Sequence, residues 1–235
     1  KVSLKLSDSD TDTIPTDIRL KNQKDHPDDL RLQEVYFQYG RYLLISSSRK
    51  GSLPANLQGI WANKIQTPWN CDYHTDINVQ MNYWPAEPAN LSECHRPLFD
   101  LIASQLEPWR QATRAAPEFQ TSAGAPRGWT VRTMNNACGI SFWKWNPPGS
   151  AWYARHFWEH LAFTRDEEYL RETAYPIFKE ICHFLEDRLK ERPDGDLLLA
   201  AALRGFFLWD RKRRALASGG PDSIGALSEA REEKR

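Results

Sequence analysis

The stretch GSAWYARHFWEHLAFTRDEEYLRETAYPIFKEICHFLEDRL, Gly149 to Leu189, decides the fold class. It contains two segments compatible with helices, separated by the short polar sequence TRDE. In the second segment Ile177, Ile181 and Phe184 recur at helical spacing, which predicts an amphipathic helix. Thr164 and Glu167 have the spacing of a capping box and predict the start of that helix. The stretch therefore predicts a helical hairpin.

Two further helices are predicted on the N-terminal side of this hairpin. The first begins behind the acidic Asp28 and Asp29, and the second is entered through Asn90 or Ser92 as a cap. Their apolar positions recur at helical spacing: Leu32, Val35, Tyr36, Tyr39, Tyr42 and Leu43 in the first, and Leu91, Leu98, Leu101, Ile102 and Leu106 in the second. Residues 30 to about 195 are thus expected to be mainly α, with ordered loops between the helices.

Three zones divide the chain of 235 residues. Residues 1–29 are polar and acidic and are interpreted as a linker or the edge of a missing N-terminal domain. Residues 30–195 form the main domain. Residues 196–235 contain no Asn, Gln, His, Tyr, Thr, Val, Cys or Met, and Ala, Leu and Arg fill half of these forty positions. Two interpretations of this atypical tail stay open: a basic helical tail, or an end read out of frame.

Composition excludes several classes of protein. Lys and Arg together number 31, as do Asp and Glu, so no overall field favours nucleic acid or an anionic membrane. No run approaches the roughly 18 apolar residues that a membrane span needs. The N-terminus KVSLKLSDSD has no apolar segment, so no signal peptide is visible. The four cysteines are scattered without a CxxC motif, which argues against a zinc ribbon. Two disulfides stay possible, but the spacing favours scattered core thiols.

The segment DYHTDINVQMNYW, Asp72 to Trp84, combines amides and carboxylates with aromatic residues. Nine of the ten tryptophans fall between Trp61 and Trp158, beside long loops rich in Asn, Gly and Pro (48–70 and 128–149). Loops of this length are usually functional. A sugar packs its C–H face on an aromatic ring, while its hydroxyls need planar donors and acceptors. This composition favours a carbohydrate site, although many of the tryptophans could equally be core residues.

The segment HFWEH, His156 to His160, fits the H-x-x-E-H pattern of some zinc peptidases. On a helix the two histidines share a face, and Glu159 could act as base. A catalytic zinc also needs a third protein ligand, and none is evident. The sequence therefore favours a helix in which Trp152, His156, Glu159 and His160 line or support a cavity, and predicts no bound metal.

Four long segments together resemble glycoside hydrolase family 95, the α-L-fucosidases, from about Pro15 to Asp194. They are YFQYGRYLLISSSRKGSLPANLQGIW, DYHTDINVQMNYWPAEPANLSECHRPLFDLI, GWTVRTMNNACGISFWKWN and AWYARHFWEHLAFTRDEEYLRETAYPIFKEICHFLED. The resemblance implies a partial (α/α)6 toroid and inverting hydrolysis of terminal α-L-fucosyl, or in some members α-L-galactosyl, residues. It implies a fucosylated oligosaccharide or polysaccharide as substrate, no cofactor, and a secreted or periplasmic location.

The resemblance also assigns roles to individual residues. Asn78 is similar to the asparagine that orients the attacking water, and Asp76 occupies a position held by Asn or Asp in relatives. The candidate substrate-binding residues are His74, Trp61, Trp69, Trp145, Gln58 and Asn136. In the family the general acid and the carboxylate that accepts the water's proton lie farther along than the PDG at Pro193 to Gly195. The chain is therefore expected to be a weak or inactive partial domain, with a non-catalytic carbohydrate-binding remnant as the alternative.

Overall fold

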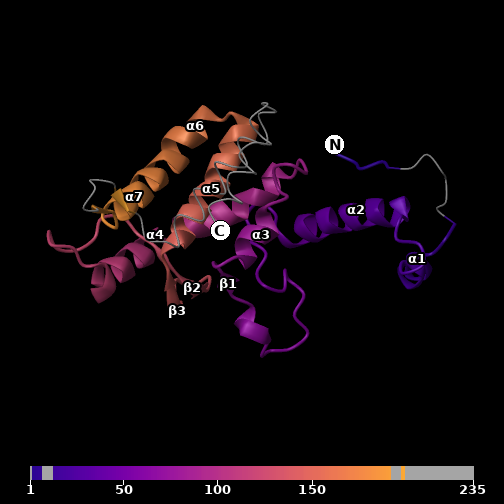
Figure 1. The fold of residues 1–235 in the computed structure, drawn as a ribbon, viewed down its shortest axis with the longest axis horizontal. Helices are drawn as coiled ribbons and strands as arrows, with labels where there is room; N and C mark the ends of the chain where they lie inside the picture. The colour runs from indigo at the N-terminus through magenta and orange to yellow at the C-terminus, as the bar shows by residue number, and fades with distance from the viewer. Residues whose placement is uncertain (1, 7–12, 192–196, 199–235) are drawn as a thin grey trace, which may run out of the picture.

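The computed structural model describes residues 2–6, 13–191 and 197–198, and these residues are mainly helical (Figure 1). The α-helices are α1 (Thr16–Asn22), α2 (Leu30–Ser47), α3 (Asn78–Tyr83), α4 (Ser92–Ala115), α5 (Pro147–Thr164), α6 (Glu167–Tyr169) and α7 (Tyr175–Glu186). Shorter turns are η1 (Pro68–Cys71), η2 (Pro117–Phe119) and the π-helical turn η3 (Leu170–Ala174). The strands are β1 (Tyr73–His74), β2 (Val131–Asn135), β3 (Ser141–Asn146), β4 (Lys190–Glu191) and β5 (Leu197–Leu198).

The predicted helical hairpin is present. Helix α5 packs against α7, and α6, η3 and α7 follow one another without a break. Helix α5 also contacts α3 and α4, whereas α2 and α1 extend to one side of this body (Figure 1). The mainly helical prediction is confirmed for the described residues. The atypical tail at residues 196–235 lies outside them, apart from the two residues of β5.

Aromatic side chains fill the core between α4 and α5. Trp109 stacks on Trp129 at 5.3 Å between ring centroids and on Tyr153 at 6.0 Å, and all three are buried. Phe99 of α4 contacts Phe157 of α5 at 4.6 Å. At least two of the tryptophans are therefore core residues, as the composition allowed.

Helices α4 and α7 are also joined at their surface. Arg110 of α4 makes a bidentate ion pair with Glu180 of α7, with nitrogen–oxygen distances of 2.7 and 2.6 Å. Gly128, in the loop before β2, approaches the same turn of α7. A Cβ placed on Gly128 would lie 1.9 Å from the carbonyl oxygen of Glu180, and its φ is +67°. Only glycine combines this backbone conformation with so close an approach.

A small antiparallel sheet in the order β1-β2-β3 lies beside the helices (Figure 1). Tyr73 pairs with Asn135, and Val131 pairs with Asn146 across the β2–β3 hairpin, whose register shifts between Arg132 and Met134. The sequence predicted ordered loops here rather than strands. Asn136 closes the hairpin, because its side-chain oxygen accepts hydrogen bonds from the backbone N–H groups of Cys138 and Ile140.

Some predicted local features are confirmed and others are wrong. Asp29 caps α2 by accepting a hydrogen bond from the N–H of Leu32 at 2.9 Å. The Thr164–Glu167 capping box is wrong: Asp166 is the cap of α6, and Thr164 ends α5. Helix α4 has Leu91 at its N-cap position with no side-chain cap, so neither Asn90 nor Ser92 has the predicted role.

Two composition-based expectations can be compared with the structure. The four cysteines are free thiols, but the expectation that they are core residues holds for Cys94 alone, since Cys71 is half-buried and Cys138 and Cys182 are exposed. In the part of the chain that the structure describes, no helix combines the length and hydrophobicity that crossing a bilayer requires.

Candidate active site

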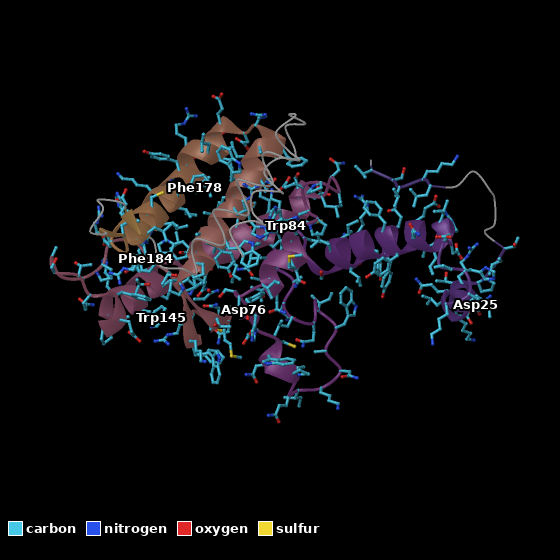
Figure 2. The ribbon with its side chains drawn as sticks, in the orientation of Figure 1. Asp25, Asp76, Trp84, Trp145, Phe178 and Phe184 are labelled. Carbon is cyan, nitrogen blue, oxygen red and sulfur yellow. The ribbon has the colours of Figure 1, made fainter. Side chains whose placement is uncertain are left out.

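A cavity of about 670 Å³ lies where the small sheet meets the start of α3. Several separate segments contribute to its wall: the loop before η1, η1 itself, the three strands and the first residue of α3. The described lining residues are Leu57, Gln58, Trp69, His74, Asp76, Asn78, Thr133, Met134 and Trp143. Figure 2 shows Asp76 beside the small sheet, close to where α3 begins.

Three neighbouring pieces of backbone bring His74, Asp76 and Asn78 to one cavity. His74 ends strand β1, Asp76 lies in the turn at residues 75–77, and Asn78 is the first residue of α3. Tyr73 and Thr75, between the lining residues, are buried. Thr75 donates its backbone N–H to the carbonyl of Thr133 at 2.8 Å and its hydroxyl to that of Arg132 at 2.9 Å. These bonds hold the segment against β2.

The polar groups of the wall can meet the needs of a sugar. Asp76 offers a carboxylate, and Asn78 offers an amide that both donates and accepts. Gln58 donates to the carbonyl of Pro68 at 3.3 Å, while its Oε1 is buried without a hydrogen-bond partner among the described residues. A buried acceptor without a partner is uncommon and is satisfied when a ligand hydroxyl donates to it.

Two tryptophans, Trp69 of η1 and Trp143 of β3, lie on the cavity wall with their rings largely exposed. Both residues have left-handed backbones, with φ of 48° and 70°. The two residues after Trp69, Asn70 and Cys71, are also left-handed. Such conformations cost about 1–3 kcal/mol for each non-glycine residue and concentrate at functional sites. Trp69 is among the site residues predicted from the sequence, whereas Trp143 is not, because strand β3 was not predicted.

Three of the predicted substrate-binding residues do not line this cavity. Trp61 packs over Gly59 and is about half exposed. Trp145 lies edge-on to Phe119 at 4.9 Å, and the Arg132 guanidinium lies 4.1 Å from its ring centre. Asn136 closes the β2–β3 hairpin. Of the eight predicted site residues, the structure therefore brings five to one cavity: Asn78, Asp76, His74, Trp69 and Gln58.

A second polar cluster is buried between α4, α5 and the loop before α4. Glu87 Oε1 accepts hydrogen bonds from Nδ1 of His95 at 2.8 Å and of His160 at 2.6 Å. Its other oxygen accepts from the Ser92 hydroxyl at 2.5 Å. Burial by itself would raise the pKa of Glu87, but these hydrogen bonds outweigh it and hold the pKa well below its usual range.

His156 extends this cluster, because its Nδ1 lies 3.0 Å from Nε2 of His95. His156 and His95 are almost fully buried, and burial lowers the pKa of both imidazoles, so both are neutral at physiological pH. A smaller cavity of about 240 Å³ adjoins the cluster and is lined by Trp84, His156 and Glu159, among others. Glu159 pairs with Arg155 on the same helix.

Glu87, His95 and His160 are the described residues whose ligand atoms lie close enough to hold a metal, within 4.8 Å of one another. However, their nitrogen–oxygen distances of 2.8 and 2.6 Å are those of hydrogen bonds. Zinc at about 2.0–2.2 Å from each ligand in tetrahedral geometry would hold those ligand atoms farther apart. The two histidines of HFWEH instead serve a hydrogen-bonded network, His160 toward Glu87 and His156 toward His95.

A helical frame that carries a concave polar site edged with tryptophan has the features of a carbohydrate-active enzyme. The chain matches the model of the glycosyl hydrolase family 95 catalytic domain over residues 1–203, and it belongs to that family.

Three relatives show the same relationship. The chain is 40% identical over 209 residues to Alpha-L-fucosidase 2 of Arabidopsis thaliana, covering 84% of this chain and 24% of the relative. It is 35% identical over 208 residues to Probable alpha-fucosidase A of Aspergillus niger, covering 85% of this chain and 26% of the relative. The Aspergillus oryzae protein of that name is 41% identical over 108 residues, covering 46% of this chain and 14% of the relative. The chain thus spans about a quarter of the length of the first two relatives.

Proposed function

We propose that the chain forms part of an inverting α-L-fucosidase and contributes the wall of the site that holds the sugar and the attacking water. The observation that carries the proposal is the cavity on which Asp76, Asn78, His74 and Gln58 meet the rings of Trp69 and Trp143. Family membership and the names of the relatives support the reaction class.

In this proposal Asn78 and Asp76 hold the water. The Asn78 amide orients it by hydrogen bonding but cannot take its proton, so the water also needs a carboxylate as base. Inversion uses two carboxyl groups about 6.5–9.5 Å apart, with room for water on one side of the sugar. Among the described lining residues, Asp76 is the one that carries a carboxylate. In this proposal Asp76 helps to hold the water, and the general acid and the base that takes the water's proton both come from outside the described wall.

The other lining residues bind the sugar. His74 and Gln58 meet its hydroxyls, and Trp69 and Trp143 stack on its C–H faces. The substrate class is a terminal α-L-fucosyl, or alternatively α-L-galactosyl, residue on an oligosaccharide or polysaccharide. We further propose that the helical hairpin is one part of an (α/α)6 toroid, whose remaining helices carry the acid side of the site.

The experiment joins residues 1–195 to the downstream catalytic segment of the Arabidopsis relative and assays an oligosaccharide that ends in Fucα1-2Gal. We expect release of L-fucose, first as the β-anomer by NMR, and a loss of about a hundredfold or more in kcat for Asn78→Ala, because removing one preorganised hydrogen-bonding group costs about 10²–10³-fold. First release of the α-anomer would contradict inversion. Fucose binding without any turnover would favour the alternative, a non-catalytic carbohydrate-binding remnant.

A further inference from the structure

Asp72 and His74 form a pair at the edge of the cavity. They are two residues apart in an extended segment, so their side chains share a face. Asp72 Oδ1 contacts Nδ1 of His74. The Asp72 side chain is 2% exposed and that of His74 is 11% exposed. The other Asp72 oxygen, Oδ2, is buried and has no hydrogen-bond partner among the described residues. The carboxylate thus has His74 as its one side-chain partner in this part of the chain.

A buried carboxylate is costly unless its partner compensates for lost hydration. Burial and the nearby Asp76 carboxylate raise the pKa of Asp72, and the hydrogen bond from His74 acts in the opposite direction. An ionised carboxylate can only accept hydrogen bonds, so it places the imidazole proton on Nδ1. The neutral ring then carries its lone pair on Nε2, because the partner of one ring nitrogen decides the state of the other.

His74 lines the cavity, and within the part of the chain described here its Nε2 makes no hydrogen bond. The backbone fixes the pair from both sides. Asp72 donates its N–H to the carbonyl of Trp69 at 3.3 Å and accepts from the N–H of Leu57 at 3.2 Å. Both of these neighbours also line the cavity. Asp72 is therefore tied to the wall although its own side chain lies behind it.

We propose that Asp72 is a positioning residue that holds His74 with its proton on Nδ1, so that His74 Nε2 accepts a hydrogen bond from a hydroxyl of the bound glycoside. The identity of the ligand rests on the proposed function, whereas the state of the ring rests on the Asp72–His74 geometry alone. His74 Nε2 would then accept a hydrogen bond from one sugar hydroxyl. The Asn78 amide can donate a hydrogen bond to the adjacent hydroxyl.

The first test needs no ligand. In the ¹⁵N-labelled 235-residue chain, two-bond ¹H–¹⁵N correlation spectra recorded at a pH where the ring is neutral should show the His74 proton on Nδ1. In Asp72→Asn the amide can donate to Nδ1, so the proton should move toward Nε2. Asp76→Asn removes a nearby charge without touching His74 and should leave the proton on Nδ1. A wild-type ring protonated on Nε2, or one that Asp72→Asn leaves unchanged, would overturn the proposal.

The second test measures L-fucose binding by NMR titration of the wild type, Asp72→Asn, His74→Ala and the double variant. Each single change should weaken binding about three- to tenfold, the value of one hydrogen bond. The double variant should lose no more than His74→Ala alone, because Asp72 acts through His74. Additive losses would overturn the positioning role. Absence of fucose binding by the wild type would instead contradict the proposed function, and the ring spectra would still decide the Asp72 assignment.

Discussion

Trp143 carries a prediction at the scale of a single residue. Its ring is 65% exposed on the cavity wall, and its backbone is left-handed. Trp143→Ala should weaken binding of a fucosyl oligosaccharide about tenfold, equivalent to about 1.4 kcal/mol, because the stacking surface is removed. The measurement is an NMR titration, with Trp158→Ala as the matched control. Trp158 is 48% exposed and does not line this cavity. Equal losses in both variants would show that Trp143 has no special role.

Gly128 is the residue whose replacement should be most costly to the fold. Gly128→Ala forces a Cβ to 1.9 Å from the Glu180 carbonyl oxygen at a φ of +67°. We expect the free energy of unfolding to fall by about 3 kcal/mol or more, as for other severe steric changes. Gly124→Ala is the control, because its φ is +112° but no atom lies within 4 Å. Its expected cost is the backbone strain alone, about 1–3 kcal/mol. Urea titration followed by circular dichroism measures both, and equal values would contradict the contact.

Residue-level prediction from sequence succeeded where amides, carboxylates and aromatic residues occur together. Their density between Asp72 and Trp84 indicated a binding site, and the structure places His74, Asp76 and Asn78 on one cavity. It failed for Trp145 and Trp143, which are two apart in β3. Regular alternation would give them one face, but the left-handed backbone of Trp143 breaks that alternation. Neither the composition nor the spacing of the sequence predicts the positive φ of Trp143.

The buried network of α4 and α5 carries the prediction at the scale of elements. Below about pH 6.5, the ordinary pKa of histidine, the unfolded chain binds protons that the buried His95 and His156 do not, because burial lowers their pKa. The folded state therefore loses stability as the pH falls, by up to about 1.4 kcal/mol per pH unit for each histidine. The folded state lowers the pKa of Glu87, so Glu87 causes a further loss of stability only when the pH falls below the ordinary pKa of a glutamate.

Urea unfolding at pH 7.0 and 5.5 measures this dependence. His156→Gln should be less stable at pH 7.0 but should show a smaller difference between the two pH values. The exposed His26 is the control, and His26→Gln should leave the difference unchanged. A wild-type chain that is equally stable at both pH values would mean that the two imidazoles are not held neutral.

Elements were predictable to different degrees. Helix α2 begins at the predicted acidic cap because Asp29 accepts a hydrogen bond from the backbone N–H of Leu32. The Asp29 carboxylate is also held by the Arg19 guanidinium at 2.8 Å. The start of the second hairpin helix was wrong by two positions, since Arg165 adopts a left-handed conformation and leaves Asp166 as the cap. The β2–β3 hairpin was missed because its residues resemble loop composition and its turn depends on one asparagine side chain.

For the whole molecule, we expect the 235-residue chain tested alone to hydrolyse α-L-fucosides weakly or not at all. The described cavity wall carries one carboxylate, that of Asp76. Inversion needs an acid that protonates the leaving oxygen and a base for the water, and the resemblance assigns both to carboxyl groups farther along than Gly195. A fucosyl oligosaccharide needs that acid more than an aryl fucoside does, so the aryl substrate should show the higher residual rate. The comparison is this chain against the fusion with the Arabidopsis segment. Equal activity from both would place the acid within residues 1–235.

The apolar surface of the described chain fits this expectation of a partial domain. On the predicted apolar face of α2, Leu32 is buried, whereas the three tyrosines Tyr36, Tyr39 and Tyr42 are exposed at 78%, 54% and 55%. Sequence periodicity predicts such a face but not which part of it is covered. The mainly helical class followed from local periodicity, whereas a closed toroid depends on contacts between distant helices, which no local pattern encodes.

The pairing of this segment with β2 has a consequence for how this gene tolerates change. Tyr73 and Thr75 are buried while His74 between them faces the cavity, so deletion of a single codon here would place buried and cavity-facing side chains on the wrong sides together. Substitutions there each disturb one contact, but a one-codon deletion would disturb every contact at once. The exposed stretch around Ile65 has no such pairing and should accept the same deletion. Length variation among natural homologues should therefore gather around Ile65 and avoid the seven residues of the cavity segment.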